Sequence, residues 1–315
     1  MMCSVNASGG GESSILRGES RLYESMSRYT TWRVGGLVQR LYIPADLEDF
    51  VTFLSLLPEN EPLWVLGLGS NLLVRDGGLP GTAILLYRGL DKLQLDSAEG
   101  GHGTIYAEAG VADAKVARFA ARNDLTGVEF FANIPGTVGG ALAMNAGCFG
   151  AETWQVVNQV MTVDRVGKLH QRSPADYNIS YRHVTLKPEK ASRREEWFVA
   201  AWFKLQHGAG DDARRKMKDM LTQRAASQPL NQPNAGSVFR NPPGDYAARL
   251  IEASGLKGTT IGGAMVSPRH ANFIVNTGAA TAADIEQLIE KVRETVAQRC
   301  GVVLHCEVKI IGERV

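Results

Sequence analysis

A chain of 315 residues is long enough for two or three domains, because one continuous hydrophobic core rarely extends over that length. Hydrophobic residues make up 44% of the chain and charged residues 21%, which is an ordinary globular composition. The 34 basic and 33 acidic residues leave a net charge of +1, so we expect neither a nucleic-acid partner nor a membrane surface. An anionic ligand must therefore be held by local groups.

The cysteines and the apolar runs predict a soluble cytoplasmic protein. None of the four cysteines stands in a zinc-like or C-x-x-C pair, which is typical of reduced thiols. The first residues contain no cationic start and no apolar stretch of signal-peptide length, and no apolar run reaches 18 residues. The glycine- and serine-rich start predicts a mobile tail over residues 1–20.

Short strands and helices alternate through the first two thirds of the chain, which indicates the α+β fold class. The structured part is expected to begin with a β-prone piece near residues 29–36. Helical spacing of apolar residues predicts a helix over residues 47–57. A second helix is predicted over 112–123, and strands over 41–44, 63–66, 72–74, 83–87, 104–108, 156–163, 167–171 and 197–205.

The glycines of residues 207–210 mark a change in composition and predict a domain boundary. A charged helix over 211–226 and a loop rich in proline, asparagine and glutamine over 228–243 follow. A helix that Asp245 can cap is predicted to end at Gly255.

Capping residues bound the last predicted helix. Thr281 stands at its start with Asp284 three residues later, as in a capping box, and Gly301 ends it. Its buried stripe is predicted to comprise Ile285, Leu288, Ile289, Val292 and Val296. A final strand is predicted over residues 302–311.

A first glycine-rich loop, Gly67-Leu68-Gly69-Ser70-Asn71, joins two predicted strands. It lacks the third glycine of a dinucleotide fingerprint, and a strand rather than a helix follows it, which argues against a Rossmann unit. Glycines can still let successive amides converge on a phosphate as a nest. A plain tight turn is the alternative.

A second glycine-rich region runs from Asn133 to Ala141 and continues from Asn145 to Gly150. Such a bare backbone allows a large ligand to approach closely. A loop-rich connection is the alternative interpretation. Two loops of this kind in one α+β body favour one extended cofactor that both loops share.

The chain resembles the UDP-N-acetylenolpyruvoylglucosamine reductases, flavoenzymes of peptidoglycan precursor synthesis. The resemblance extends from about residue 20 to the C-terminus and rests on Arg33–Gly36, Gly67–Val74 and Ile134–Gly140. It implies an FAD-binding body of the vanillyl-alcohol oxidase type, made of two subdomains, followed by a C-terminal α+β substrate-binding domain. These three parts are expected at residues 21–86, 87–207 and 208–315.

The resemblance also implies that the two loops hold the FAD pyrophosphate and flank the isoalloxazine, without a covalent bond. NADPH is the implied hydride donor, and it uses the same cleft as the substrate. The residues expected to bind FAD are Arg33, Gly35, Gly67, Gly69, Ser70, Asn71, Leu72, Ile134, Pro135, Gly136, Thr137, Gly139, Gly140, Asn145 and Gly147.

Three distant segments match the family's active site and supply Arg182, Ser237 and Glu307. The resemblance assigns Ser237 as proton donor, with Arg182 and Glu307 ordering an enolpyruvyl group. The residue types suit this chemistry, because a guanidinium binds a carboxylate through two donors and a well-placed serine hydroxyl can protonate a strongly basic carbon. Taken alone, the serine could cap a turn, the arginine could form a surface ion pair, and Glu307 could lie on the solvent face of a strand.

Substrate contacts are expected from Tyr181, Arg240 and Asn241. Arg240 stands where the family often has lysine, and it would bind a pyrophosphate in a forked geometry. Because 54 residues lie between Arg182 and Ser237, residues 183 to 236, the chain resembles the shorter branch of the family, which lacks an extra tyrosine loop. No metal ligands are expected.

The predicted function is NADPH-dependent reduction of UDP-N-acetylglucosamine enolpyruvate to UDP-N-acetylmuramate through FAD, by a monomer or weak homo-oligomer. An FAD oxidase of the same cofactor fold is one alternative. A flavin-binding module without catalysis and a structural protein with glycine-rich turns are two others. The retention of Ser237, Arg182 and Glu307 together argues against the module.

Overall fold

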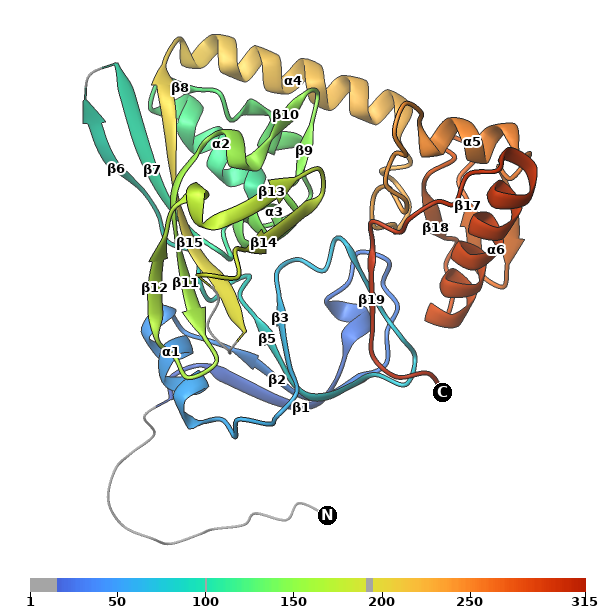
Figure 1. The fold of residues 1–315 in the computed structure, drawn as a ribbon, viewed down its shortest axis with the longest axis horizontal. Coiled ribbons are helices and arrows are strands. Elements are labelled where there is room, and N and C mark those ends of the chain that lie inside the picture. Colours follow the sequence, from blue (N-terminus) through green and yellow to red (C-terminus); the bar gives the residue numbers. More distant parts are fainter. Residues whose placement is uncertain (1–15, 100, 191–194) are drawn as a thin grey trace, which may run out of the picture.

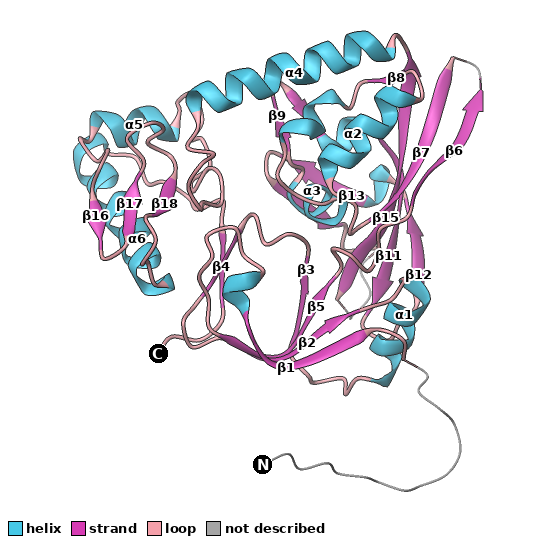
Figure 2. Cartoon of the chain, turned by 180° about the vertical axis from the view of Figure 1, so that it is seen from behind, coloured by secondary structure: helices cyan, strands magenta, loops and turns pink. Residues whose placement is uncertain are grey.

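The computed structural model describes residues 16–99, 101–190 and 195–315, so most of the predicted N-terminal tail and Cys3 lie outside the described residues. The chain forms three parts in sequence order (Figures 1 and 2). The first holds a small sheet with helix α1, the second holds the largest sheet with α2, α3 and α4, and the third holds α5 and α6 beside a short sheet. No helix among the described residues is long and apolar enough to cross a bilayer.

The first part is a four-stranded sheet in the order β1-β2-β5-β3. β1 is antiparallel to β2, while β5 is parallel to both β2 and β3. The helix packs its buried phenylalanines into a core that also includes residues of the second sheet. The elements are β1 (Glu19–Ser25), η1 (Met26–Arg28), β2 (Leu37–Ile43), α1 (Leu47–Leu56), β3 (Leu63–Leu66), β4 (Leu72–Val74) and β5 (Leu79–Leu85).

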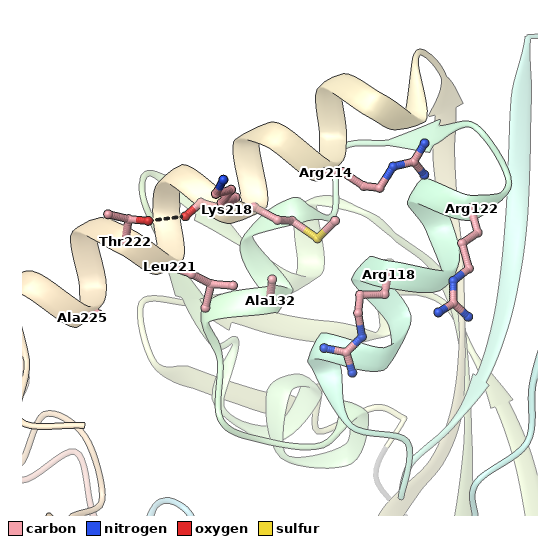
Figure 3. Close-up of a pocket in the computed structure, with 9 residues that line it drawn as sticks. Arg118, Arg122, Ala132, Arg214, Lys218, Leu221, Thr222 and Ala225 are labelled. Atoms are coloured by element: carbon pink, nitrogen blue, oxygen red, sulfur yellow. Dashed lines mark hydrogen bonds between the residues drawn. The ribbon is translucent and has the colours of Figure 1, made fainter. Parts of the chain in front are cut away.

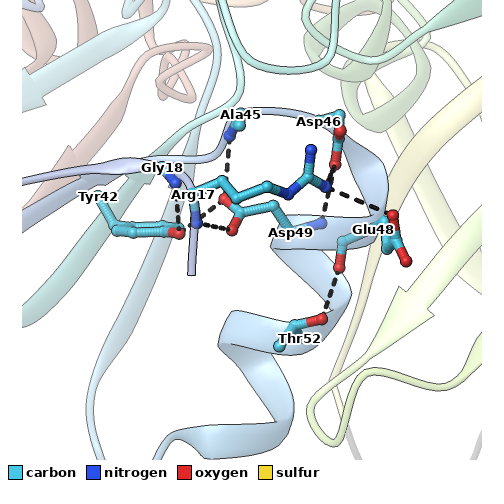
Figure 4. A network of polar contacts seen from close by, with 8 residues as sticks. All are labelled: Arg17, Gly18, Tyr42, Ala45, Asp46, Glu48, Asp49 and Thr52. Carbon is cyan, nitrogen blue, oxygen red and sulfur yellow. Dashed lines mark hydrogen bonds and ion pairs between the residues drawn. The ribbon is translucent and has the colours of Figure 1, made fainter. Parts of the chain in front are cut away.

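The structured chain begins earlier than the sequence predicts, because β1 starts at Glu19 rather than near residue 29. Most residues of β1 are exposed, so the strand has no apolar alternation from which it could be predicted. A network of polar contacts holds the residues just before β1 against β2 and α1 (Figure 4). Asp49 of α1 is 1% exposed and accepts hydrogen bonds from the Tyr42 hydroxyl at 2.6 Å, the Arg17 amide at 2.7 Å and the Ala45 amide at 2.9 Å.

The second part is a six-stranded sheet in the order β12-β11-β15-β7-β6, with β8 paired to β15. Helices α2 and α3 pack on this sheet in one core, which Ala213 and Met217 of α4 also enter. The elements are β6 (Leu93–Glu99), β7 (His102–Glu108), α2 (Asp113–Arg122), β8 (Leu125–Thr126), η2 (Glu129–Asn133), α3 (Val138–Met144), β9 (Gly147–Cys148), β10 (Ala151–Glu152), η3 (Thr153–Gln155), β11 (Val157–Asp164), β12 (Leu169–Arg172), η4 (Pro174–Asp176), β13 (Tyr177–Ser180), β14 (His183–Leu186), β15 (Glu196–His207) and α4 (Gly210–Ser227).

The third part confirms the predicted caps of the last helix. The Thr281 side chain accepts from the Asp284 amide, the Asp284 carboxylate accepts from the Thr281 amide, and Gly301 ends the helix at φ 68°. All five residues of the predicted stripe are buried. The elements are α5 (Ala247–Ala253), β16 (Thr260–Ile261), β17 (Ala264–Val266), β18 (Ile274–Asn276), α6 (Ala282–Cys300) and β19 (Lys309–Ile311).

The third part contacts the first part at two places. β19 pairs in parallel with β4, so the end of the chain lies beside the strand that follows the first glycine loop. Trp32 is fully buried in the core of the third part, and its ring nitrogen donates to the Ile274 carbonyl at 2.7 Å. The predicted final strand was too long, because Cys306 makes only an isolated bridge with Phe239 and regular pairing starts at Lys309.

We expect Asp49→Asn to lower the free energy of unfolding by about 2–3 kcal/mol at pH 7, because an amide replaces a buried acceptor of three hydrogen bonds. Burial works to raise the pKa of Asp49, but the hydrogen bonds from Tyr42, Arg17 and Ala45 outweigh it and lower the pKa. The stabilisation is therefore complete above the unfolded pKa of about 3.9 and is lost as the pH falls through the lower folded pKa. Urea unfolding of both proteins between pH 3 and 7 tests this. A difference that grew on acidification would contradict the assignment.

Candidate functional site

The two glycine loops, which belong to different parts of the chain, meet in the structure. A Cβ atom on Gly67 would collide with Oγ1 of Thr137, and a Cβ on Gly136 would lie 3.8 Å from Oγ of Ser70. Gly67 belongs to the loop between β3 and β4, whereas Gly136 and Thr137 precede α3. The structure therefore brings together the two segments that were predicted to share one ligand.

Both loops present backbone amides that have no acceptor among the described residues. Within the described part of the chain, the amides of Gly69, Ser70 and Asn71 donate no hydrogen bond, and neither do those of Thr137 and Gly140. A cluster of free amides from two loops suits a ligand with several anionic oxygens. The donors therefore fit a pyrophosphate.

Gly69 is required at its position for two reasons. Its φ of 63° lies in the left-handed region, and a Cβ would collide with the Tyr29 carbonyl oxygen. The Gly69 carbonyl also accepts from the Thr31 amide at 3.2 Å, which joins this loop to residues 30–36. Arg33 and Gly35 of that segment have positive φ angles, and Arg33 is exposed.

The remaining predicted FAD residues support the loops from within or border them. Leu72 is buried in the strand that follows the first loop. Gly139 packs closely against the residue that follows β7, because a Cβ on Gly139 would lie 3.0 Å from that of Ala109. Ile134 and Pro135 lie within the second loop.

Arg182 and Glu307 form an ion pair although they lie 125 residues apart in sequence. Nε of Arg182 donates to Oε1 of Glu307 at 3.0 Å, and the two side chains are 16% and 17% exposed. Arg182 stands in the turn between β13 and β14 with a φ of 55°. Two of the three predicted catalytic residues are thus in direct contact.

Two backbone carbonyls hold the other nitrogens of Arg182. Nη1 donates to the Asn145 oxygen at 3.1 Å and Nη2 to the Gly147 oxygen at 2.6 Å. The Asn145 side chain is 1% exposed and binds Glu152, the Ser180 carbonyl and the Trp154 amide. Asn145 is a predicted cofactor contact, and in this structure its carbonyl also helps to position Arg182. No pattern in the sequence indicated this role.

Ser237 lies beside Glu307 through their backbones. The Val238 carbonyl accepts from the Glu307 amide at 2.8 Å, and the Arg240 amide donates to the His305 carbonyl at 2.9 Å. The Ser237 hydroxyl is part-buried and makes no hydrogen bond to another described residue. It is therefore available to a ligand.

The charged groups around Glu307 give the site a net positive charge. Burial raises the pKa of Glu307, while Arg182 and Arg240 act in the opposite direction. Nε of Arg240 is buried and has no partner among the described residues. Two guanidinium groups beside one carboxylate leave a net cation, which favours an anionic ligand.

Tyr181 and Asn241, the other predicted substrate residues, differ in accessibility. The Tyr181 ring is 43% exposed, and Cζ of Arg182 lies 4.9 Å from its centroid. Oδ1 of Asn241 accepts from the Ala247 amide at 3.1 Å, so this side chain supports the start of α5. The predicted cap, Asp245, instead pairs with Arg249.

Comparisons with known proteins agree on one family. Residues 38–173 match an FAD binding domain, and residues 228–311 match the C-terminal domain of UDP-N-acetylenolpyruvoylglucosamine reductase. The chain is 57% identical to the reductase of that name from Nitrosospira multiformis, over 94% of this chain and 90% of that protein. It is 55% identical to the one from Thiobacillus denitrificans, over 97% and 96%.

A solved structure shows the same architecture. The crystal structure of UDP-N-acetylenolpyruvylglucosamine reductase from Thermus caldophilus superposes with a TM-score of 0.77 and is 32% identical in sequence. It covers 94% of this chain and 99% of that chain. The likeness therefore extends over all three parts of the fold.

Two substitutions of Asn145 should distinguish the stability that its side-chain hydrogen bonds contribute from the effect of its backbone conformation. We expect Asn145→Gly to lower the free energy of unfolding by about 2–3 kcal/mol, because three hydrogen bonds are lost. Asn145→Ala should cost about 1 kcal/mol more, because the φ of 42° is unfavourable for alanine. Urea unfolding measures both values. Equal stability of Asn145→Ala and the wild type would contradict the structural role.

Proposed function

The chain belongs to the UDP-N-acetylenolpyruvoylglucosamine reductase family, and on that premise we propose that it reduces the enolpyruvyl group with NADPH as hydride donor and Ser237 as proton donor. It is an FAD-containing oxidoreductase of peptidoglycan precursor synthesis. The observation that carries the residue assignment is the Arg182–Glu307 ion pair, which lies beside the Ser237 segment. The product of this reaction is UDP-N-acetylmuramate.

The two glycine loops would hold the cofactor through the free amides of Gly69, Ser70, Asn71, Thr137 and Gly140. When bound, FAD supplies the hydride that is added to the terminal carbon of the enolpyruvyl double bond. NADPH would use the same cleft before the substrate, since the sequence has no separate nicotinamide-dinucleotide motif.

Arg182 would bind the carboxylate of the enolpyruvyl group and the negative charge that develops on the adjacent carbon. Its guanidinium is held by the carbonyls of Asn145 and Gly147 and by Glu307, so it needs little reorganisation when charge develops. Arg240 would add a second cation for the carboxylate or the diphosphate. Glu307 would orient Arg182 or, when protonated, donate a hydrogen bond to the intermediate.

Ser237 would donate its proton to the carbon that bears the developing charge. A serine hydroxyl is a weak acid, but the acceptor is strongly basic, so position matters more than acidity. The hydroxyl has no acceptor among the described residues, which leaves its proton free for the substrate.

The structure favours non-covalent FAD over the tethered flavin of many related oxidases. Cys148 is the cysteine of the loop region, and its thiol donates to the Phe130 carbonyl at 3.4 Å. Burial raises the pKa of Cys148 to about 11, so little thiolate is available for attachment. Acid precipitation that leaves the flavin in solution would agree with this.

The location, the assembly and the domain limits are part of the same proposal. A reaction on a nucleotide-sugar precursor suits the cytoplasm, and the chain would act as a monomer or weak homo-oligomer. The limits 21–86, 87–207 and 208–315 are supported by the separate family matches at 38–173 and 228–311. They depart from the grouping of elements at two places, because β1 starts at Glu19 and α4 (Gly210–Ser227) packs in the core of the second part.

The first test is Ser237→Ala. We expect NADPH to reduce the bound flavin at the wild-type rate, whereas reoxidation by the enolpyruvyl substrate slows by about 10²- to 10⁴-fold. Stopped-flow absorbance separates these two half-reactions. Ser55→Ala is the control, because Ser55 is an exposed serine of α1 whose hydroxyl donates to the Thr52 carbonyl of the same helix. Normal reoxidation in Ser237→Ala would show that another group donates the proton.

A second test addresses the fit of FAD. Gly140 lies in α3, and a Cβ there would have only Oγ1 of Thr137 within 4.0 Å. Gly140→Ala should therefore keep or slightly raise the stability of the apoprotein, by up to about 1 kcal/mol. The added methyl group should nevertheless raise the dissociation constant of FAD about tenfold or more. Titration of apoprotein with FAD measures it, and unchanged affinity would remove Gly140 from the cofactor site.

A further inference from the structure

Arg224, near the end of α4, reaches the loop that precedes α3. Its Nη1 donates to the Asn133 carbonyl at 2.8 Å, and its Nε donates to Oε1 of Gln228 at 2.9 Å. The side chain is part-buried, and no acidic group pairs with it among the described residues. Burial lowers the pKa of Arg224, as expected for a cation without a counter-ion.

The contact of Arg224 with Asn133 lies at the junction of two domains, because α4 connects them. The helix lies outside both matched family segments, which end at residue 173 and begin at residue 228. It packs on η2 and α2 of the FAD-binding body. A groove of about 620 Å³ lies between α2 and α4, and Figure 3 shows the residues that line it. Arg224 thus joins the FAD-binding body to the helix that leads into the substrate-binding domain.

The loop that Arg224 holds has few polar anchors of its own. Both side-chain polar atoms of Asn133 are buried and have no partner among the described residues. The same is true of the Asp113 carboxyl, which faces Gly136, and burial raises its pKa well above the ordinary value. The position of the Asn133 carbonyl therefore depends strongly on the charged donor that Arg224 supplies.

The end of α4 also touches the C-terminal domain and the surroundings of Arg182. Nη1 of Arg269 donates to the carbonyls of Ala225 and Gln228, at 3.1 and 3.4 Å. On the other side, the charges of Arg224 and Arg182 both act to lower the pKa of Cys148, against the larger effect of burial. One short stretch, Arg224 to Gln228, thus contacts the cofactor loop and the substrate-binding domain.

We propose that Arg224 is a positioning residue for FAD: it fixes the start of the second glycine loop at Asn133 and couples that loop to the substrate-binding domain through the end of α4. The proposal concerns cofactor affinity and does not depend on Ser237 or on the substrate. It can therefore fail while the proposed reaction stands, and the reverse also holds.

A structural anchor without influence on the cofactor is the competing explanation, and the chain contains a matched control for it. Arg214 lies on the same helix (Figure 3), and its Nη1 donates to the Ala121 carbonyl of α2 at 3.0 Å. Arg214 also pairs with Asp211 on the surface. Removing Arg214 breaks an equivalent tie between α4 and the body, but at a distance from the glycine loops.

The experiment compares Arg224→Ala, Arg224→Lys and Arg214→Ala as apoproteins titrated with FAD, with thermal unfolding of each apoprotein in parallel. We expect the FAD dissociation constant to rise about 10- to 100-fold in Arg224→Ala, because a charge-assisted hydrogen bond to the loop is lost. Arg214→Ala should stay within about twofold of the wild type in FAD affinity. Arg224→Lys should fall between them, since a lysine can donate to Asn133 but cannot also hold Gln228.

Two results would overturn the proposal. One is an FAD affinity of Arg224→Ala within about twofold of that of the wild type. The other is an equal loss of FAD affinity in Arg224→Ala and Arg214→Ala, which would indicate that α4 as a whole has loosened. If Arg224→Ala does not fold, Arg224→Lys decides by the same measurement, and wild-type affinity of that variant together with an unchanged visible spectrum of its bound flavin counts against the proposal.

Discussion

The ion pair between Arg182 and Glu307 is the interaction on which the geometry of the site depends. It joins the hairpin of the second part to the segment that leads into β19, across 125 residues of sequence. Both side chains are largely removed from solvent, so loss of either partner leaves a buried charge and costs about 3–5 kcal/mol. In the proposed reaction, the pair would hold the guanidinium where the substrate carboxylate binds.

The rest of the structure supports that pair from three directions. The carbonyls of Asn145 and Gly147 restrain Arg182, and the Val238 carbonyl restrains the backbone of Glu307. Pairing of β19 with β4 then sets the Glu307 segment beside the strand that begins where the first glycine loop ends. The first glycine loop and the Glu307 segment are therefore connected by regular backbone pairing, and Arg182 joins them through its side chain.

Local patterns were sufficient for some elements and insufficient for others. The apolar spacing of α1 and α2 and the caps of α6 are local features, and the structure confirms these helices to within one or two residues. β1 is stabilised by pairing with β2 and by Asp49, neither of which leaves a periodic pattern in its own residues. α3 contains Gly139 and Gly140, which oppose helix formation in isolation, so its helical state depends on packing against the large sheet.

The sequence by itself determined the α+β class, the two glycine loops, the family and the identity of the residues expected to do the chemistry, because motif residues and helix spacing are encoded within short segments. Only the tertiary structure decided that Arg182 contacts Glu307, that the Asn145 carbonyl accepts from Arg182, and that Arg224 donates to the Asn133 carbonyl. Each of these depends on contacts between segments at least 35 residues apart. Neither composition nor periodicity predicts which distant backbone carbonyl accepts from a guanidinium, because such contacts form only when the three parts pack together.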